Sequence, residues 1–184
     1  MKSASILDKD QSQLVVIDVQ SKLAGVMPSD VSAVIKNIAM LLQAVNLLEI
    51  PSLYTEQYPK GLGPTVTELT EHLASQKAVE KTTFSCCAEP AFKRRLFSDR
   101  QQIILAGMEA HICVLQTALD LQAQGKLVFV VEDAVISRNP ANKLNAINRL
   151  RQAGVIVTNT ESVVFEWLGV AEGDAFKKIS QLVR

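Results

Sequence analysis

The sequence is poor in the residues that build disulfide frameworks and metal sites. Its 184 residues include three cysteines and two histidines, and neither an H-E-x-x-H segment nor paired C-x-x-C motifs occur. Cys86 and Cys87 are adjacent, which suits neither an ordinary disulfide nor a zinc knuckle. The sequence therefore predicts no metal site, and its unpaired thiols favour a reducing, cytoplasmic location.

An excess of one charge and a phosphate-binding motif are both missing. Nineteen basic residues balance nineteen acidic ones without a block of like charge, so no electrostatic footprint for nucleic acid or an anionic membrane is present. The glycine pair in KGLGPT lacks the spacing of a P-loop, and no predicted strand is followed by G-x-G-x-x-G. We therefore expect no nucleic-acid partner, no bound nucleotide and no other cofactor.

Long apolar runs are missing as well. No run approaches the ~20 residues that span a bilayer, and the start, MKSASILDKDQSQ, has no apolar segment typical of a signal peptide. We therefore expect no membrane partner. The hydrophobic fraction of 48% is ordinary for a globular protein, and no repeat or linker divides the chain. The sequence predicts one domain over residues 1–184.

Short apolar strands alternate with helical patterns along the chain, and the stretch between residues 55 and 65 is the most loop-like part. This alternation predicts an α/β fold, with a three-layer, Rossmann-like parallel sheet of five to six strands and helices on both faces. The strands are expected at residues 13–19, 50–54, 78–79, 101–107, 126–133 and 154–159, and the helices at 30–48, 66–73, 90–96, 110–124, 139–153, 161–168 and 174–183.

Asp18 lies at the end of the first predicted strand, in QLVVIDV. Ligands of parallel sheets bind beyond the carboxyl ends of the strands, and an ionised carboxylate that follows an apolar strand must be paired or face a polar cleft. A functional role is therefore one interpretation of Asp18. The other is that it caps the turn that follows.

Cys113 lies near the start of a predicted helix, in LAGMEAHICVLQTALDL. The unpaired N–H groups and the macrodipole at a helix N-terminus favour a thiolate, and the same N–H groups can stabilise an oxyanion. We therefore expect the sulfur to be held as an anion and to act as a nucleophile. The alternative is a structural thiol, because free cysteine is among the most buried residue types.

Two further candidates are not selected by pattern alone. Spacing does not separate Lys81, in EKTTFSCC, from the other lysines, most of which are solvated in any protein. His111 lies two residues before Cys113, but side chains that are neighbours at a helix start need not meet. We expect His111 to line a pocket rather than to form a catalytic pair.

Three segments in this order, LVVIDVQ, EKTTFSCC and LAGMEAHICVLQTALDL, resemble the isochorismatase-like cysteine hydrolases. The later segments VVEDAVISR and TNTESVVFEWLG are most similar to the subgroup of isochorismatase domain-containing proteins. The resemblance implies a catalytic triad of Asp18, Lys81 and Cys113. It also implies a non-proline cis peptide between Met108 and Glu109, with the N–H groups of Glu109 and Cys113 as the oxyanion hole.

Departures from the family narrow the activity. Metal-binding nicotinamidases carry an Asp-x-His motif and a further histidine after the second strand, where this sequence reads TEQYPKGLG. Members that hydrolyse isochorismate itself generally lack the cysteine. The resemblance therefore implies neither a metal-assisted nicotinamidase nor an isochorismate hydrolase.

The resulting hypothesis is a cysteine hydrolase that acts on a small amide or related acyl compound through an acyl-enzyme. Candidate pocket residues are Gln20, Tyr58, Phe84 and His111. The resemblance also implies a homo-oligomer, a dimer or a tetramer. One alternative is a catalytically idle oligomeric scaffold whose apolar tail around Val164 to Leu168, which includes Trp167, makes a subunit contact. Another, a flavodoxin-like nucleotide-binding module, is weakened by the missing glycine motifs.

Overall fold

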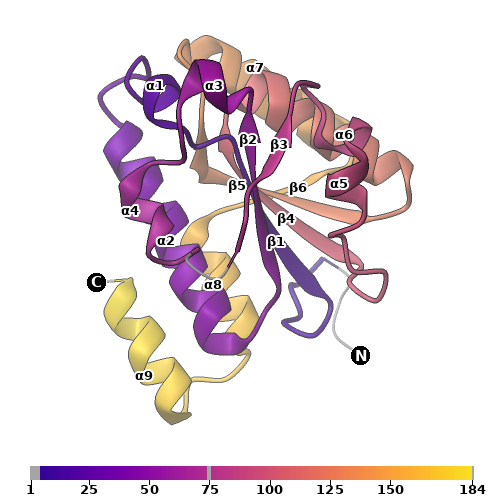
Figure 1. The fold of residues 1–184 in the computed structure, drawn as a ribbon. Coiled ribbons are helices and arrows are strands. Elements are labelled where there is room, and N and C mark those ends of the chain that lie inside the picture. Colours follow the sequence, from indigo (N-terminus) through magenta and orange to yellow (C-terminus); the bar gives the residue numbers. More distant parts are fainter. Residues whose placement is uncertain (1–4, 74–75, 184) are drawn as a thin grey trace.

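Six parallel strands form a single sheet in the computed structural model, which describes residues 5–73 and 76–183 (Figure 1). Residues 1–4 of the polar start and residue 184, which the expected domain includes, lie outside this description. The strand order is β3-β2-β1-β4-β5-β6. This confirms the expected α/β fold with a parallel sheet. The strands are β1 (Ser12–Ile17), β2 (Ser52–Gln57), β3 (Val79–Lys81), β4 (Gln102–Met108), β5 (Leu127–Ile136) and β6 (Ile156–Thr158).

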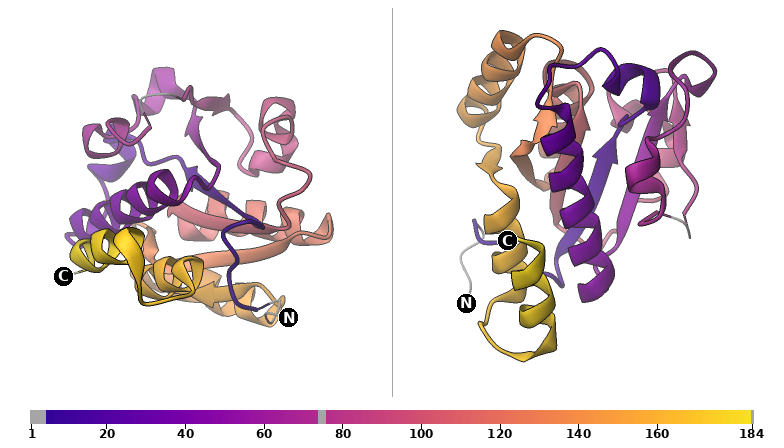
Figure 2. Two further views of the ribbon diagram at one scale, coloured as in Figure 1. Left: turned by 90° about the horizontal axis from the view of Figure 1, so that it is seen from below. Right: turned by 90° about the vertical axis from the view of Figure 1, so that its left-hand side faces the viewer.

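Helices cover both faces of the sheet because successive strand residues point to opposite sides. In β1, Leu14 and Val16 pack in one core cluster, whereas Val15 and Ile17 pack in the other. The first cluster is covered by α2 (Val31–Leu48), α8 (Thr160–Leu168) and α9 (Gly173–Leu182), and Figure 2 shows α9 beside α2. The second is covered by α5 (Pro90–Lys93), α6 (Leu115–Ala123) and α7 (Pro140–Gln152). Shorter helices are α1 (Ser21–Ala24), α3 (Pro59–Leu62) and α4 (Thr67–Thr70), with a 3₁₀ turn at Cys86–Ala88 and a π-helical turn at Ala110–Val114.

One helix, α2, is long and apolar enough by length and composition to span a bilayer, as far as the described residues show. In the fold its apolar side packs on the sheet, where Ile38, Leu41 and Val45 are fully buried. The helix thereby forms a large part of the first core cluster.

In the scaffold alternative the apolar tail makes a subunit contact, but the side chain of Trp167 is not free to take part in one. The indole is 1% exposed, and its Nε1 donates a hydrogen bond of 2.9 Å to Ser12 Oγ in β1. Trp167 therefore holds α8 to the sheet from inside the molecule.

Several expected boundaries also differ. The second strand begins at Ser52 rather than residue 50 and continues to Gln57, so the expected loop between residues 55 and 65 is partly β2 and partly α3. The helix expected from residue 110 is preceded by a wider turn, in which Val114 N donates to Glu109 O (3.3 Å). Such π-helical turns are frequent at functional sites.

The sheet has its topological switch between β1 and β4, because the chain builds β2 and β3 on one side of β1 before it crosses to β4. A crevice beyond the carboxyl ends of the strands is expected at such a switch. Gly107 allows the two strands to approach there: its φ is +119°, and a Cβ would lie 2.0 Å from Ile17 O. The strand ends therefore meet closely where Asp18 follows β1.

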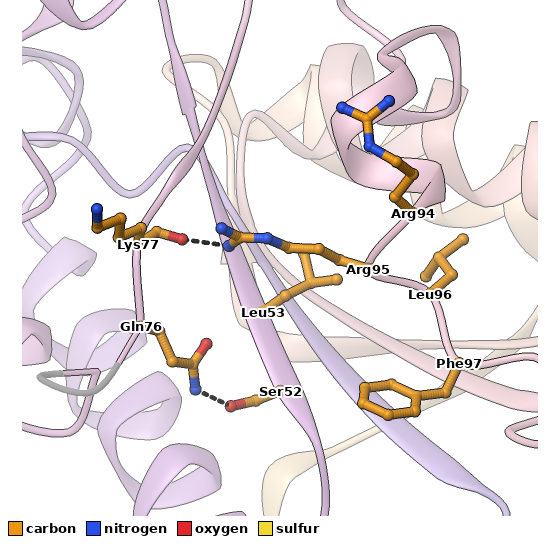
Figure 3. Close-up of a pocket in the computed structure, with 8 residues that line it drawn as sticks. All are labelled: Ser52, Leu53, Gln76, Lys77, Arg94, Arg95, Leu96 and Phe97. Atoms are coloured by element: carbon orange, nitrogen blue, oxygen red, sulfur yellow. Dashed lines mark hydrogen bonds between the residues drawn. The ribbon is translucent and has the colours of Figure 1, made fainter.

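The opposite, amino end of the sheet holds a cavity of about 590 Å³ (Figure 3). Its rim carries three exposed cationic side chains, and Gln76 Nε2 donates to Ser52 Oγ (2.8 Å) across it. None of the sequence-predicted site residues lines this cavity. The lining residues are Ser52, Leu53, Gln76, Lys77, Arg94, Arg95, Leu96 and Phe97.

Candidate active site

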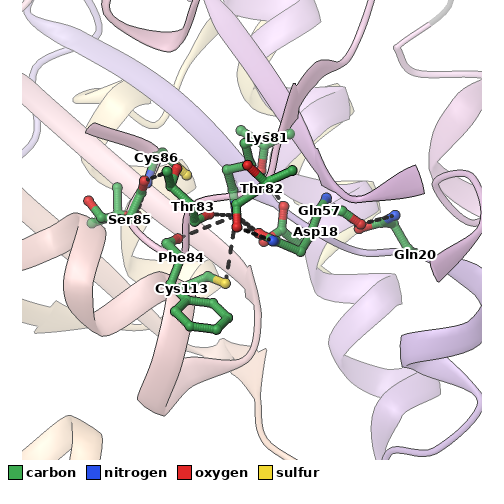
Figure 4. A network of polar contacts seen from close by, with 12 residues as sticks. Asp18, Gln20, Gln57, Lys81, Thr82, Thr83, Phe84, Ser85, Cys86 and Cys113 are labelled. Atoms are coloured by element: carbon green, nitrogen blue, oxygen red, sulfur yellow. Dashed lines mark hydrogen bonds and ion pairs between the residues drawn. The ribbon is translucent and has the colours of Figure 1, made fainter. Parts of the chain in front are cut away.

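Asp18, Lys81 and Cys113 lie together at the carboxyl end of the sheet (Figure 4). Lys81 Nζ is 2.7 Å from Asp18 Oδ2 and 3.7 Å from Cys113 Sγ. Asp18 follows β1, Lys81 ends β3, and Cys113 lies in the π-helical turn after β4. The three residues are 0%, 3% and 6% exposed, so the group is buried but not sealed.

The backbone of Asp18 adopts a left-handed conformation with φ of +52°. Aspartate tolerates this region better than most residues, yet such a conformation still costs about 1–3 kcal/mol. The side chain is held by two hydrogen bonds: Oδ1 accepts from Thr55 Oγ1 (2.6 Å) and Oδ2 accepts from Lys81 Nζ. These bonds fix the direction of the carboxylate.

The Lys81 ammonium is surrounded by hydrogen-bond acceptors. Besides Asp18, its Nζ donates to Gln57 Oε1 (2.6 Å) and to the carbonyl oxygens of Thr83 (3.2 Å) and Phe84 (3.3 Å). Burial lowers the pKa of this amine, but the Asp18 carboxylate acts in the opposite direction, and the net pKa is above its usual value. Lys81 is therefore charged at neutral pH.

Gln57 is a site residue that the sequence patterns did not reveal. It pairs with Lys81 in the register of β2 and β3, and it lines the same cavity as Cys113. The expected strand ended at residue 54, which placed Gln57 in a loop. A strand continued to Gln57 would have put this amide at the carboxyl edge beside Lys81.

Gln20 supports Gln57 rather than lining the cavity. Its Nε2 donates to Gln57 O (3.1 Å) and Gly63 O (2.7 Å), and its Oε1 accepts from Gln57 N (2.8 Å). The side-chain amide thus continues the backbone pairing beyond the end of β1. The expected pocket role of Gln20 is replaced by a structural one.

Cys113 is a thiol in the free protein. Burial raises its pKa far above the usual range, and the Asp18 carboxylate adds to this, while the Lys81 ammonium acts in the opposite direction. The expectation that the helix start would hold the sulfur as an anion is therefore wrong for the resting state. Burial also raises the pKa of Cys86 to about 12 and that of Cys87 to about 11.

A cavity of about 300 Å³ is lined by both Cys113 and Asp18. Phe84, a predicted wall, lines it together with further apolar side chains. The lining residues are Asp18, Leu23, Gln57, Leu62, Phe84, Glu109, Ile112, Cys113 and Arg138.

Tyr58 and His111, which were expected in the pocket, lie outside it. Tyr58 is 55% exposed and lines a separate cavity next to Lys81. His111 turns toward the segment after β5, where its Nδ1 is 2.9 Å from Ser137 Oγ and its Nε2 is 3.4 Å from Asn142 Nδ2. The imidazole therefore contacts that segment rather than the sulfur of Cys113.

The turn that leads to Cys113 begins with a cis peptide between Met108 and Glu109, at the position implied by the resemblance. The Glu109 carboxylate is buried and accepts from Arg138 N (2.9 Å) and from Arg138 Nε (3.1 and 3.2 Å), and Arg138 Nη2 forms an ion pair with its Oε1 at 3.1 Å. Arg138, which sequence reasoning missed, thus ties this turn to the segment after β5.

Within residues 5–73 and 76–183, no group of three or more His, Cys, Asp or Glu side chains suits a metal ion.

The chain is similar to known proteins over most of its length. A family model described as the isochorismatase domain matches residues 12–162. A protein of Danio rerio described as isochorismatase domain-containing protein 2 is 42% identical over 94% of this chain and 86% of its own length. Isochorismatase family protein 1A of Dictyostelium discoideum is 35% identical over 99% of this chain and 90% of its own length.

Solved structures share the fold. One described as the MAR1 ribonuclease of Caenorhabditis elegans superposes with a TM-score of 0.91 at 38% identity, over 97% of this chain and 92% of that one. The YcaC gene product of Escherichia coli, described as an octameric hydrolase of unknown specificity, superposes with a TM-score of 0.90 at 22% identity, over 99% and 92%.

Proposed function

Because this chain belongs to the isochorismatase family, we propose that it is a hydrolase that cleaves a small amide or related acyl compound through Cys113. Family membership supports hydrolase activity in general. The observation that supports the cysteine mechanism is the buried group of Asp18, Lys81 and Cys113, two of which, Asp18 and Cys113, line a cavity.

In the proposed first step the Asp18 carboxylate accepts the thiol proton as Cys113 Sγ attacks the carbonyl carbon. A general base is needed because the raised pKa keeps the sulfur protonated at rest. Lys81 Nζ, 3.7 Å away, stabilises the sulfur as it gains negative charge. The N–H groups of Glu109 and Cys113 then donate to the oxyanion of the tetrahedral intermediate.

Collapse of that intermediate completes acylation. The C–N bond breaks, Asp18 returns its proton to the leaving amine, and a thioester remains on Cys113. Water then gives a proton to Asp18 as it attacks the thioester carbonyl, and the acid product leaves with regeneration of the thiol. Removal of one oxyanion donor typically costs about 3–4 kcal/mol of transition-state stabilisation.

The size of the cavity supports a small substrate. Its volume of about 300 Å³ is at the lower end of the range for ligand pockets. Leu23, Leu62, Phe84 and Ile112 give it apolar walls. The description of the C. elegans neighbour as a ribonuclease makes RNA a necessary member of any substrate panel.

We propose in addition that the protein is a homo-oligomer. The support is the description of the E. coli neighbour as octameric. Light scattering coupled to gel filtration would measure the state, for which the resemblance implies a dimer or a tetramer. A monomer at micromolar concentration would exclude this part of the proposal.

A hydrolysis screen of small amides, ureides, esters and RNA tests the activity. The wild type is run beside Cys113→Ala, with Cys87→Ala as the matched control, because Cys87 is also buried but does not line the cavity. We expect one or more small acyl compounds to be cleaved by the wild type and the control, and not by Cys113→Ala. Equal cleavage by Cys113→Ala would overturn the mechanism, and no cleavage by the wild type would favour the idle scaffold.

A further inference from the structure

The cavity at the amino end of the sheet shares no lining residue with the candidate active site. Its position follows from a short connection. Between β3 and β4 the chain forms a three-residue 3₁₀ turn and the four-residue α5, so this connection, all of which the structure describes, supplies no longer helix to cover the start of β2. Leu53, whose side chain belongs to the second core cluster, forms part of the lining there.

One wall of this cavity is anchored to the sheet from below. Gln13 in β1 is fully buried, and its Nε2 donates to Arg95 O (2.9 Å) while its Oε1 accepts from Phe97 N (3.0 Å). A buried amide that satisfies both backbone groups holds the segment after α5 in one conformation. The wall that carries Arg95 and Phe97 is therefore fixed before any ligand binds.

The facing wall is tied to the sheet and to the first wall. Gln76 Nε2 donates to Ser52 Oγ (2.8 Å), and Arg95 Nη1 donates to Lys77 O across the opening (Figure 3). The Arg95 side chain therefore lies over the cavity. Within residues 5–73 and 76–183 this is the one hydrogen bond that its guanidinium makes, so its other N–H groups are available to a ligand.

The charge of the lining has one sign. Lys77, Arg94 and Arg95 line the cavity, and none of the described lining residues is acidic. No ion pair among the described residues includes any of the three cations. The chain as a whole has equal numbers of acidic and basic residues, so this excess is local and favours an anion.

The remaining lining is largely apolar. Leu53 is buried, Leu96 is half-buried, and Phe97 is 52% exposed, so an aromatic ring is left open at the edge of the cavity. The volume of about 590 Å³ lies well within the range of small-molecule sites, which combine apolar walls with a few polar groups. A matching ligand has an anionic head and an apolar body.

We propose that this cavity is a second ligand site, which binds a small organic carboxylate. Arg95 donates to the carboxylate, to which the planar guanidinium is suited, and the apolar chain packs on Leu96 and Phe97. The claim concerns binding alone and needs no turnover, so it does not depend on the proposed hydrolase activity.

The test uses octanoate as the probe and two compounds that each lack one of its features. Acetate keeps the carboxylate without the chain, and octanol keeps the chain without the charge. Equilibrium binding to the full chain is measured by calorimetry. We expect octanoate to bind at least about tenfold more tightly than either compound, because chain burial and the charge-assisted hydrogen bonds both contribute.

Two variants locate the carboxylate end of the site. Arg95→Gln keeps an N–H donor near Lys77 O but removes the charge, so we expect octanoate binding to weaken about tenfold. Lys93→Gln is the matched control, because it removes the same charge from an exposed residue of α5 outside the lining. It should leave the affinity unchanged.

Two further variants locate the apolar end. Phe97→Ala removes the exposed ring, and we expect octanoate binding to weaken severalfold. Leu144→Ala removes a comparably exposed apolar side chain on α7 outside the cavity and should have no effect. Thermal unfolding of each variant confirms that the protein is folded.

Absence of octanoate binding, the result expected if a second copy of the chain covers the cavity, would overturn the inference. An affinity equal to that of octanol, or one that both Arg95→Gln and Phe97→Ala leave intact, would overturn it as well, because octanoate would then bind elsewhere. Binding that depends on Arg95 and Phe97 would support the second site even if the hydrolysis screen finds no substrate.

Discussion

At the scale of single residues, the site consists of two ion pairs set around one thiol. Asp18 pairs with Lys81 in full burial, and Glu109 pairs with Arg138 at the rim. Removing one partner of a buried ion pair lowers the stability of the fold far more than removing one partner of an exposed pair. Each pair therefore helps to keep the charged groups of the site in position. Cys113 lines the same cavity as Asp18, Glu109 and Arg138, and Asp18 is its proposed base.

Asp18→Asn separates the electrostatic role of this residue from its shape. Asparagine adopts a left-handed backbone as readily as aspartate, so the φ of +52° is retained, but the Lys81 ammonium loses its countercharge. We expect the free energy of unfolding in urea to fall by about 3–5 kcal/mol and hydrolysis to be abolished. Glu132→Gln, which breaks the exposed pair with Arg151, should cost about 0–1 kcal/mol; an equally small effect of Asp18→Asn would show that Lys81 does not depend on this pair.

At the scale of elements, the site depends on where strands end. The apolar patterns located every strand of the sheet, most clearly β1 and β5, whose buried runs are rich in β-branched residues. They did not locate the polar ends: β2 continues to Gln57 and β5 to Ile136, where the side chains are no longer uniformly apolar. Gln57 is the last residue of the extended β2, and Arg138 comes shortly after the extended β5. The apolar patterns therefore missed both residues. Asp18 was found because its strand ends where its apolar run ends.

The contact between β1 and β4 can be tested at Gly107. Alanine there would place Cβ 2.0 Å from Ile17 O in a backbone with φ of +119°, so one strand end must move and the turn to Cys113 with it. We expect a loss of several kcal/mol in unfolding free energy and loss of hydrolysis. Gly125→Ala is the matched control, because its φ is +84° but its Cβ would meet nothing within 4 Å, and it should cost about 1 kcal/mol. Equal effects of the two substitutions would contradict the close approach of the strands.

At the scale of the whole molecule, the two core clusters enclose the sheet and leave the carboxyl edge as the place where charged groups from distant segments meet. The order of the strands, with β1 and β4 adjacent at the switch, brings Asp18 and Cys113 together across 95 residues of chain. Lys81 could not be selected from pattern alone, because its partner lies in a strand two positions away in the sheet. The resemblance to a family supplied that residue, and the geometry agrees with it.

Global stability should also decrease in alkali. Burial raises the pKa of Cys86 to about 12 and of Cys87 to about 11, and that of Cys113 is raised as well. Above pH 9 the unfolded chain loses these protons while the folded chain keeps them, so the free energy of unfolding falls as pH rises from 9 to 11. The slope is up to about 1.4 kcal/mol per pH unit for each thiol. Urea unfolding at several pH values measures it, and a slope that Cys87→Ala does not reduce would contradict the assignment.

The proposed mechanism requires Cys113 to carry the acyl group during turnover. Once the screen supplies a substrate, acid quenching of the wild type during turnover followed by peptide mass spectrometry measures this directly. We expect an adduct with the mass of the acyl group on the peptide that contains Cys113, and none on the peptides that contain Cys86 and Cys87. Steady turnover with the adduct on another residue, or with Cys113 unmodified throughout, would contradict it.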